Sequence, residues 1–138
     1  QLPVWSPGGD KLLFNRSFSQ PIILDSSKPF LSQNPLPLEA ENAPERWVMM
    51  SSWSPDSEKL AGYIVSGGTG EAGVFVYSFA TRRYEKMSDF GVIPVWLSDN
   101  RRLFFYQRDK IYLLDSQTKQ TEEILSVAPN RVQRATIS

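Results

Sequence analysis

Two aspartates at equivalent places of a repeated motif are the first candidates for chemistry in this sequence. Asp56 follows Trp53-Ser54-Pro55, and Asp99 follows Trp96-Leu97-Ser98. Recurring carboxylates could line a calcium site, because Ca²⁺ prefers oxygen ligands. In tight polar turns, however, an aspartate normally accepts hydrogen bonds from nearby backbone N–H groups. We therefore predict that both carboxylates stabilise their own turns and that the chain holds no metal and no cofactor.

The glycine-rich segment Gly67-Gly68-Thr69-Gly70 is the second candidate, for phosphate binding. It lacks the Gly-Lys-Ser/Thr that ends a P-loop, and a predicted strand follows it where a helix is required. We expect a hairpin loop there. The sequence also contains no cysteine and no histidine, which excludes thiolate chemistry, a Ser-His-Asp triad and a His-based zinc site within these residues. Carboxylates and tyrosines could still act as acids and bases, but we predict no enzymatic activity within the chain.

Charge and hydropathy narrow the classes of partner. Fifteen basic residues balance fifteen acidic ones among 138 residues, so no net field favours nucleic acid or an anionic membrane surface. No apolar run approaches the length of a membrane span, and no signal segment is evident at the start of the sequence. We expect neither nucleic-acid binding nor membrane insertion, while the compartment stays undecided.

A repeat organises the elements that position these residues. Trp5, Trp53 and Trp96 are separated by 48 residues (5 to 53) and 43 residues (53 to 96), and each opens a polar turn that leads into an apolar strand. A period of this length, built from short strands and turns, is typical of propeller blades. Aromatic rings can serve as ligand platforms, but a residue that recurs at one blade position usually fills the space between sheets. We predict that the three tryptophans are structural.

The expected fold is all-β: a β-propeller segment of three four-stranded antiparallel blades plus one extra inner strand. We place blade 1 at about 2–33, a loop at 34–46, blade 2 at about 47–87, blade 3 at about 92–125 and the extra strand at 132–138. The outer strand of blade 1 is expected at residues 29–32. Three blades are few for a closed ring, which has roughly four to eight. A homodimer would complete a ring of six.

One rim of this propeller is the candidate binding face. Loops that join an outer strand to the next inner strand, and a second strand to a third, emerge on the same side, and the long segments 34–46 and 66–73 are of these kinds. Binding residues often lie on such loops, although neutral variation in loop length is the alternative. We hypothesise that this face contacts a protein or a small ligand through Glu41, Arg46, Trp47, Glu71, Arg108 and Arg131.

The motif Trp-Ser-Pro-Asp-x-x-Lys-Leu at Trp53 to Leu60, together with Ile111-Tyr112-Leu113-Leu114-Asp115, resembles the TolB-like propeller repeat, a relative of the WD repeat. The resemblance covers nearly all of the chain and is specific for the fold. It implies a bacterial, extracytoplasmic, non-catalytic scaffold or sensor. Similar propellers also accompany bacterial serine/threonine kinases and serine peptidases, so the alternative is a regulatory or gating propeller of a larger enzyme.

Overall fold

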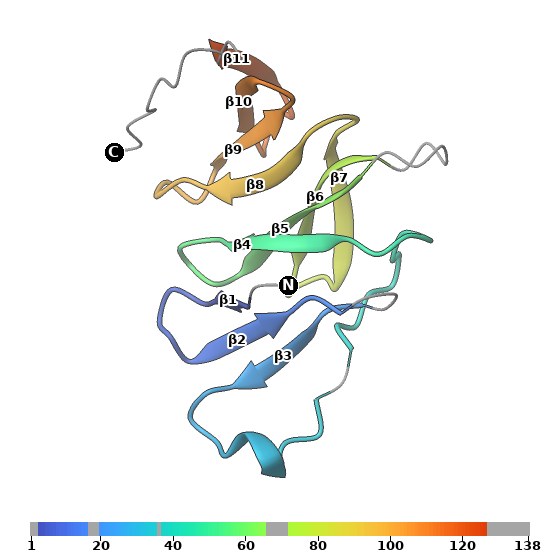
Figure 1. The fold of residues 1–138 in the computed structure, drawn as a ribbon, viewed down its shortest axis with the longest axis vertical. Coiled ribbons are helices and arrows are strands. Elements are labelled where there is room, and N and C mark those ends of the chain that lie inside the picture. The colour runs from blue at the N-terminus through green and yellow to red at the C-terminus, as the bar shows by residue number, and fades with distance from the viewer. Residues whose placement is uncertain (1–2, 17–19, 36, 66–71, 127–138) are drawn as a thin grey trace.

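The structure is a computed structural model that describes residues 3–16, 20–35, 37–65 and 72–126. Three separate antiparallel sheets follow one another along the chain, as Figure 1 shows from bottom to top. The first sheet contains β1 (Val4–Trp5), β2 (Lys11–Phe14) and β3 (Ile22–Asp25). The second contains β4 (Met49–Trp53), β5 (Lys59–Ile64), β6 (Gly73–Ser78) and β7 (Arg83–Ser88). The third contains β8 (Val92–Trp96), β9 (Arg102–Gln107), β10 (Lys110–Asp115) and β11 (Thr121–Ser126).

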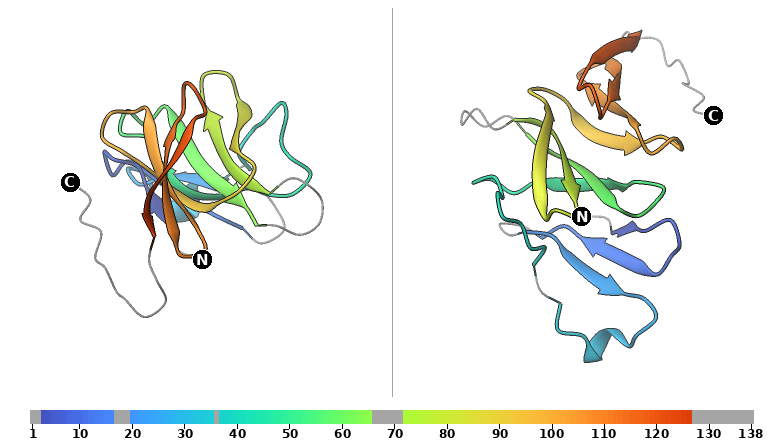
Figure 2. Two further views of the ribbon diagram at one scale, coloured as in Figure 1. Left: turned by 90° about the horizontal axis from the view of Figure 1, so that it is seen from above. Right: turned by 180° about the vertical axis from the view of Figure 1, so that it is seen from behind.

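Within each sheet, strands pair in chain order, each with its neighbour in sequence. The first strands of successive sheets also meet, since β1 contacts β4 and β4 contacts β8. Figure 2 shows that the sheets are fanned and twisted relative to one another. The all-β fold with three consecutive antiparallel sheets, predicted from the repeat, is confirmed. Within the described ranges, no helix is long and apolar enough to cross a membrane.

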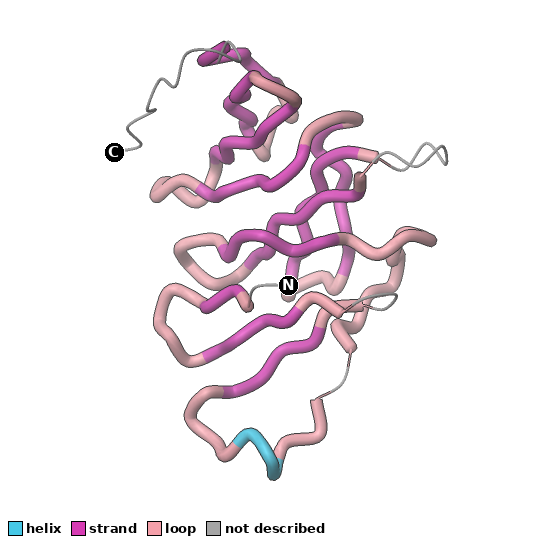
Figure 3. The backbone as a smooth tube through the Cα atoms, viewed as in Figure 1, coloured by secondary structure: helices cyan, strands magenta, loops and turns pink. Residues whose placement is uncertain are grey.

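The first sheet differs from the prediction, because its described strands number three and the strand expected at 29–32 is absent. A short 3₁₀ helix, η1 (Phe30–Ser32), takes its place and is coloured cyan in Figure 3. The reason lies at the outer edge of β3. The side-chain amide of Gln33 bonds both the N–H of Asp25 (2.8 Å) and its carbonyl (2.7 Å). Further along the edge, Pro37 bridges Ile22. These contacts use groups that a fourth strand would need.

Two apolar clusters hold the sheets together, one in each space between neighbouring sheets. In the first, Trp53 is 5% exposed, and its Nε1 donates to the Val4 carbonyl at 3.0 Å. In the second, Trp96 is 7% exposed, and its Nε1 has no hydrogen-bond partner among the described residues. Trp5 departs from this pattern and is 53% exposed. The reason is that each tryptophan faces the preceding sheet, and no described sheet precedes β1.

A peripheral segment, residues 38–42, ties the first sheet to the second, and we call it the strap. It begins at the edge of β3, where the Leu38 N–H donates to the Pro21 carbonyl at 2.8 Å. It ends at β7, where the Asn42 amide accepts from the Tyr84 N–H (2.7 Å) and donates to the Tyr84 carbonyl (2.8 Å). The Asn42 side chain thus imitates one residue of a pairing strand.

Candidate interaction site

A hollow lies where the chain enters β4 and leaves β5. Arg46 and Trp47 lie shortly before β4, separated from it by Val48, while Ile64 is the last residue of β5 and Val65 follows it. Together with Met49 they line a cavity of about 290 Å³. Arg46 Nη1 donates to the Val65 carbonyl at 3.2 Å, which joins the two walls. Four of the five lining side chains are largely apolar, so the hollow can accept an apolar group beside a cation.

A second cavity, of about 470 Å³, lies at the same ends of the strands. Its lining residues come from all three sheets: Pro3, Val4, Asn15, Met49, Met50, Ser51, Tyr63 and Ile93. Met49 lines both cavities. They therefore adjoin, and we call the combined surface the inner groove.

Irregular backbone shapes this groove. The β4–β5 register shifts between Met50 and Ser52, and the β8–β9 register shifts between Val92 and Val95. Such bulges redirect side chains and interrupt the ladder. At the first bulge, the side chain of Asn15 bonds the backbone of Met50. Its amide donates to the Met50 carbonyl and accepts from the Met50 N–H, both at 2.8 Å. At the second, Ile93 adopts a φ of 54° and is 44% exposed.

Glycine lets β4 approach β5 closely beneath the groove. A Cβ on Gly62 would lie 2.6 Å from the Met49 carbonyl and 2.9 Å from Met50 Sδ. Both distances are below what real Cβ atoms show, so any larger residue would displace the strand that carries the two methionines. The shape of the groove thus depends on Gly62 as well as on its lining.

The side chains that line the inner groove are of types common at binding surfaces. Methionine adapts to partners of differing shape, and arginine, tryptophan, tyrosine and methionine are enriched where protein interfaces are most buried. No group of three or more Asp or Glu residues that could hold a metal occurs in the part of the chain that the structure describes. The groove has room for an apolar side chain of a partner, with a polar or acidic side chain of the same partner beside Arg46.

The structure brings together some of the residues predicted for the binding face and separates others. Arg46 and Trp47 line the inner groove. Glu41 lies elsewhere, on the strap, where its N–H donates to the Arg82 carbonyl (2.9 Å) and its carboxylate pairs with Arg83 (3.4 Å). Arg108 is exposed in the β9–β10 hairpin and lines neither cavity.

Other predictions fall outside the described residues, namely Glu71, Arg131, most of the 66–73 loop and the extra strand at 132–138. Conversely, Asn15, Met49, Met50 and Tyr63 line the groove although sequence reasoning did not single them out. The sequence did contain one indication of these groove residues. The adjacent methionines Met49 and Met50 stand shortly before the repeat tryptophan Trp53.

The turns that carry Asp56 and Asp99 lie at the opposite ends of the strands. Asp56 accepts from Ser54 Oγ (2.6 Å) and the Glu58 N–H (3.0 Å). Asp99 accepts from the N–H groups of Arg101 (3.0 Å) and Arg102 (2.9 Å). The turns are also linked, since the Asp56 N–H donates to Asn100 Oδ1 at 2.8 Å.

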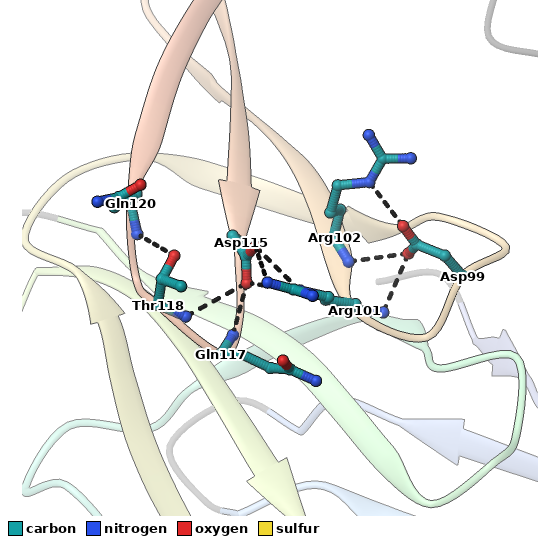
Figure 4. A network of polar contacts seen from close by, with 7 residues as sticks. All are labelled: Asp99, Arg101, Arg102, Asp115, Gln117, Thr118 and Gln120. Atoms are coloured by element: carbon teal, nitrogen blue, oxygen red, sulfur yellow. Dashed lines mark hydrogen bonds and ion pairs between the residues drawn. The ribbon is translucent and has the colours of Figure 1, made fainter.

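Figure 4 shows that the charged side chains at these strand ends, opposite the inner groove, form ion pairs and hydrogen bonds with one another. Arg102 Nε reaches Asp99 at 2.6 Å, and Arg101 reaches Asp115 through Nε (2.9 Å) and Nη2 (2.8 Å). The hydrogen bond from Arg101 is the main reason why the pKa of Asp115 is lowered. These carboxylates are held as anions by their partners, which fits a structural role and not that of a general acid.

Acid should weaken the Asp99 turn. Bonds from the backbone N–H of Arg102, the Arg102 guanidinium and the N–H of Arg101 lower the pKa of Asp99 from 3.8 to about 2. A carboxyl whose pKa is lower in the folded state stabilises the fold above its unfolded value, and this contribution disappears as pH falls through the folded value. We expect the melting temperature of the wild-type chain to exceed that of the Asp99→Asn variant, and this difference should be largest above pH 4. The margin should shrink as pH falls and vanish only below pH 2, and a margin independent of pH would contradict the assignment.

Comparison with known proteins agrees with this architecture. No family model matches the sequence. The Tol-Pal system protein TolB of Alcanivorax borkumensis is 36% identical over 59 residues, which are 41% of this chain and 13% of that protein. Among solved structures, a protein assigned as TolB from Agrobacterium tumefaciens is similar with a TM-score of 0.64 and 15% identity, over 91% of this chain and 61% of that one.

Two peptidases contain similar structures. Dipeptidyl peptidase 4 of Porphyromonas gingivalis matches with a TM-score of 0.60 and 14% identity, over 90% of this chain and 19% of that one. The β-propeller domain of the Trilobed protease from Pyrococcus furiosus, described as having an open velcro topology, matches with the same TM-score and identity, over 90% of this chain and 42% of that one. The chain thus spans less than two thirds of each of these proteins. Its fold is that of a TolB-like β-propeller segment.

Proposed function

We propose that this TolB-like propeller segment is a non-catalytic interaction module that binds a protein partner through the inner groove. The observation that carries the proposal is the concentration of Arg46, Trp47, Met49, Met50 and Tyr63 around two adjoining cavities. These are the side-chain types most enriched in the buried centres of protein interfaces. Both cavities leave space for a ligand group beside these side chains.

The chemistry of the partner follows from the lining. An apolar side chain of the partner fills the space beside Met49 and Met50, where burial of apolar surface drives association. The Arg46 guanidinium at the margin favours a carboxylate next to that anchor through charge attraction, to the extent that salt does not screen it. The expected ligand is an extended segment with an aromatic or aliphatic anchor flanked by acidic residues.

A display library of random linear peptides, panned against the 138-residue chain, tests this function. We expect enriched peptides to combine an apolar anchor with acidic neighbours. Replacing Trp47 with alanine should weaken their binding about 30-fold, which corresponds to about 2 kcal/mol at an interface hot spot. Met49→Lys should weaken it at least as much, because a charge would enter both cavities.

A matched control is Phe30→Ala, which truncates an aromatic side chain that is 52% exposed on η1, away from the groove. Its affinity should stay within about twofold of the wild type, as expected for a residue outside the interface. Enriched peptides that bind Trp47→Ala and Met49→Lys as well as the wild type would overturn the proposal. Equal losses in the groove variants and in Phe30→Ala would do the same.

A second candidate is a regulatory or gating propeller of a larger enzyme. The observation that favours it is the structural similarity to two peptidases, to one of them through its β-propeller domain. The module would then position or admit a substrate for a catalytic domain elsewhere in the polypeptide. A complete gene that encodes a peptidase or kinase domain beside these residues would decide for this candidate.

A further inference from the structure

A further cavity lies between the second and third sheets, away from the inner groove. Its volume is about 370 Å³, and its lining residues differ from those of the groove. Most of its walls come from β5, β6 and β7, and Ser116, which directly follows β10, lines it from the third sheet. Val76 and Met87 give it an apolar wall and belong to the cluster that packs between these two sheets. The cavity thus continues the space between two packed sheets of one chain.

A row of three polar side chains crosses the second sheet beside this cavity, and we call it the polar row. Lys59 of β5 is paired with Ser78 of β6, and Ser78 is paired with Arg83 of β7. Residues directly opposite one another in antiparallel strands point to the same face, and all three line the cavity. Two strand spacings separate the backbones of the two cations by about 10 Å. Their long side chains can therefore reach one anion above the serine.

The ammonium of Lys59 has room for a new partner. Among the described residues it makes no ion pair and no hydrogen bond, and Asp56 attracts it only from beyond ion-pair distance. The hydroxyls of Ser78, Thr81 and Ser116 also line the cavity, and they form no hydrogen bond within the part of the chain that the structure describes. Ammonium and hydroxyl groups are donors. The cavity therefore presents several donors that an oxyanion could use without displacing an existing bond.

Two carboxylates near the polar row have cation partners of their own. Glu85, which lines the cavity, pairs with Lys119 of the β10–β11 turn at 3.1 Å, and this pair also ties β7 to the third sheet. Glu41 of the strap pairs with Arg83 at 3.4 Å, and both side chains are more than half exposed. Such exposed pairs contribute little stability. Arg83 can therefore exchange Glu41 for the anion of a ligand.

We propose that this cavity binds a small organic anion, with a phosphate or carboxylate group over the polar row and an apolar body against Val76 and Met87. Charge-assisted hydrogen bonds from the two cations hold the anionic group, and burial of the apolar body adds affinity. A phosphate offers more oxygens than a carboxylate to donors spread over three strands, so it is the favoured group. The site is separate from the inner groove, and the inference does not depend on the function proposed there.

Titration of the ¹⁵N-labelled 138-residue chain with phenyl phosphate, followed by two-dimensional ¹H–¹⁵N spectra, tests this site. We expect saturable shifts concentrated at the amide groups of Ser78, Thr81, Arg83 and Ser116. Benzoate carries a carboxylate on the same ring and should bind more weakly than phenyl phosphate. Benzyl alcohol is neutral, and its affinity should be lower by at least about tenfold, because the charged hydrogen bonds are lost. Tighter binding of benzoate would keep the anion site and assign a carboxylate to it.

Substitutions of lysine identify the cation that matters. Lys59→Gln should weaken phenyl phosphate binding at least about tenfold, while Lys59→Arg keeps the charge and should stay within about threefold. Lys28→Gln removes a cation from the edge of the first sheet and is the matched control, with unchanged affinity. The spectrum of each free variant shows whether it is folded.

Four results would overturn the proposal. They are the absence of saturable shifts with phenyl phosphate, shifts centred on the inner groove, equal affinities of Lys59→Gln and Lys28→Gln, and binding of benzyl alcohol as tight as that of phenyl phosphate. The third result would reduce the effect to the overall charge of the chain, and the fourth would reduce it to the apolar wall of the cavity.

Discussion

Replacing Trp53 with alanine is expected to lower the free energy of unfolding by about 3–5 kcal/mol, the range seen when a large aromatic residue is removed from a core. Trp53 is 5% exposed between the first and second sheets and stacks on Phe79 with a ring-centroid distance of 5.6 Å. The substitution leaves a cavity and also deprives the Val4 carbonyl of its indole partner. Because domains are only marginally stable, much of the population should then lose the contact between these sheets.

Urea denaturation followed by circular dichroism measures this effect, at one protein concentration for all variants because association shifts apparent stability. Leu31→Ala is the control. Leu31 is fully exposed, and substitutions of this kind usually stay within about 0.5 kcal/mol. A Trp53→Ala midpoint no lower than that of Leu31→Ala would show that this tryptophan does not hold the two sheets together.

Replacing Gly91 with alanine is the second substitution with a large expected effect. Gly91 lies between β7 and β8 with a φ of 104°, a conformation that side-chain-bearing residues rarely adopt. A Cβ there would lie 2.2 Å from Cδ2 of Phe105. Phe105 is fully buried and stacks on Tyr112 at 5.3 Å, so its ring has no free space to move into. Backbone strain and overpacking together should destabilise the chain by about 2–5 kcal/mol.

The same denaturation experiment, with a second variant, separates the two causes. Phe105→Leu removes part of the ring that the new methyl group would meet, at the expense of core volume. If the clash dominates, the combined effect of Gly91→Ala and Phe105→Leu should be clearly smaller than the sum of the single effects, as expected for contacting residues. Simple additivity would leave the backbone conformation as the main cause. Stability of Gly91→Ala equal to wild type would contradict the packing described here.

The sequence was most informative where one motif recurs. The Trp-Ser-Pro-Asp turn predicts a strand on either side, and the three turns have equivalent bonds: the N–H groups of Ser6, Ser54 and Leu97 each donate to the carbonyl five residues later at 2.9 Å. Repetition identifies such a position because the same local hydrogen bonds form each time. Prediction was wrong at residues 29–32, where one side chain, Gln33, occupies the edge of β3.

The candidate site was harder to predict for a physical reason. Arg46 and Trp47 could be placed at the rim because they adjoin a long loop, but Asn15 reaches the site through a pairing with Met50, 35 residues away in sequence. The bulges that turn Met49 and Ile93 toward the groove leave no mark in the hydrophobic alternation. Glu41 was expected at the same rim, yet the strap carries it to Arg82 and Arg83. Contacts between distant segments decide these positions.

The strap has a further consequence for the behaviour of the chain at high concentration. The outermost strand of a sheet presents unpaired backbone groups that can recruit a strand from another molecule and begin aggregation. At Tyr84 both of these groups are occupied by the amide of Asn42. The guanidinium groups of Arg82 and Arg83 beside it are paired with Glu39 and Glu41 of the strap, which adds charge along the same edge. A single asparagine on a loop therefore occupies, at this point of the edge, the backbone groups through which a strand of another molecule could pair.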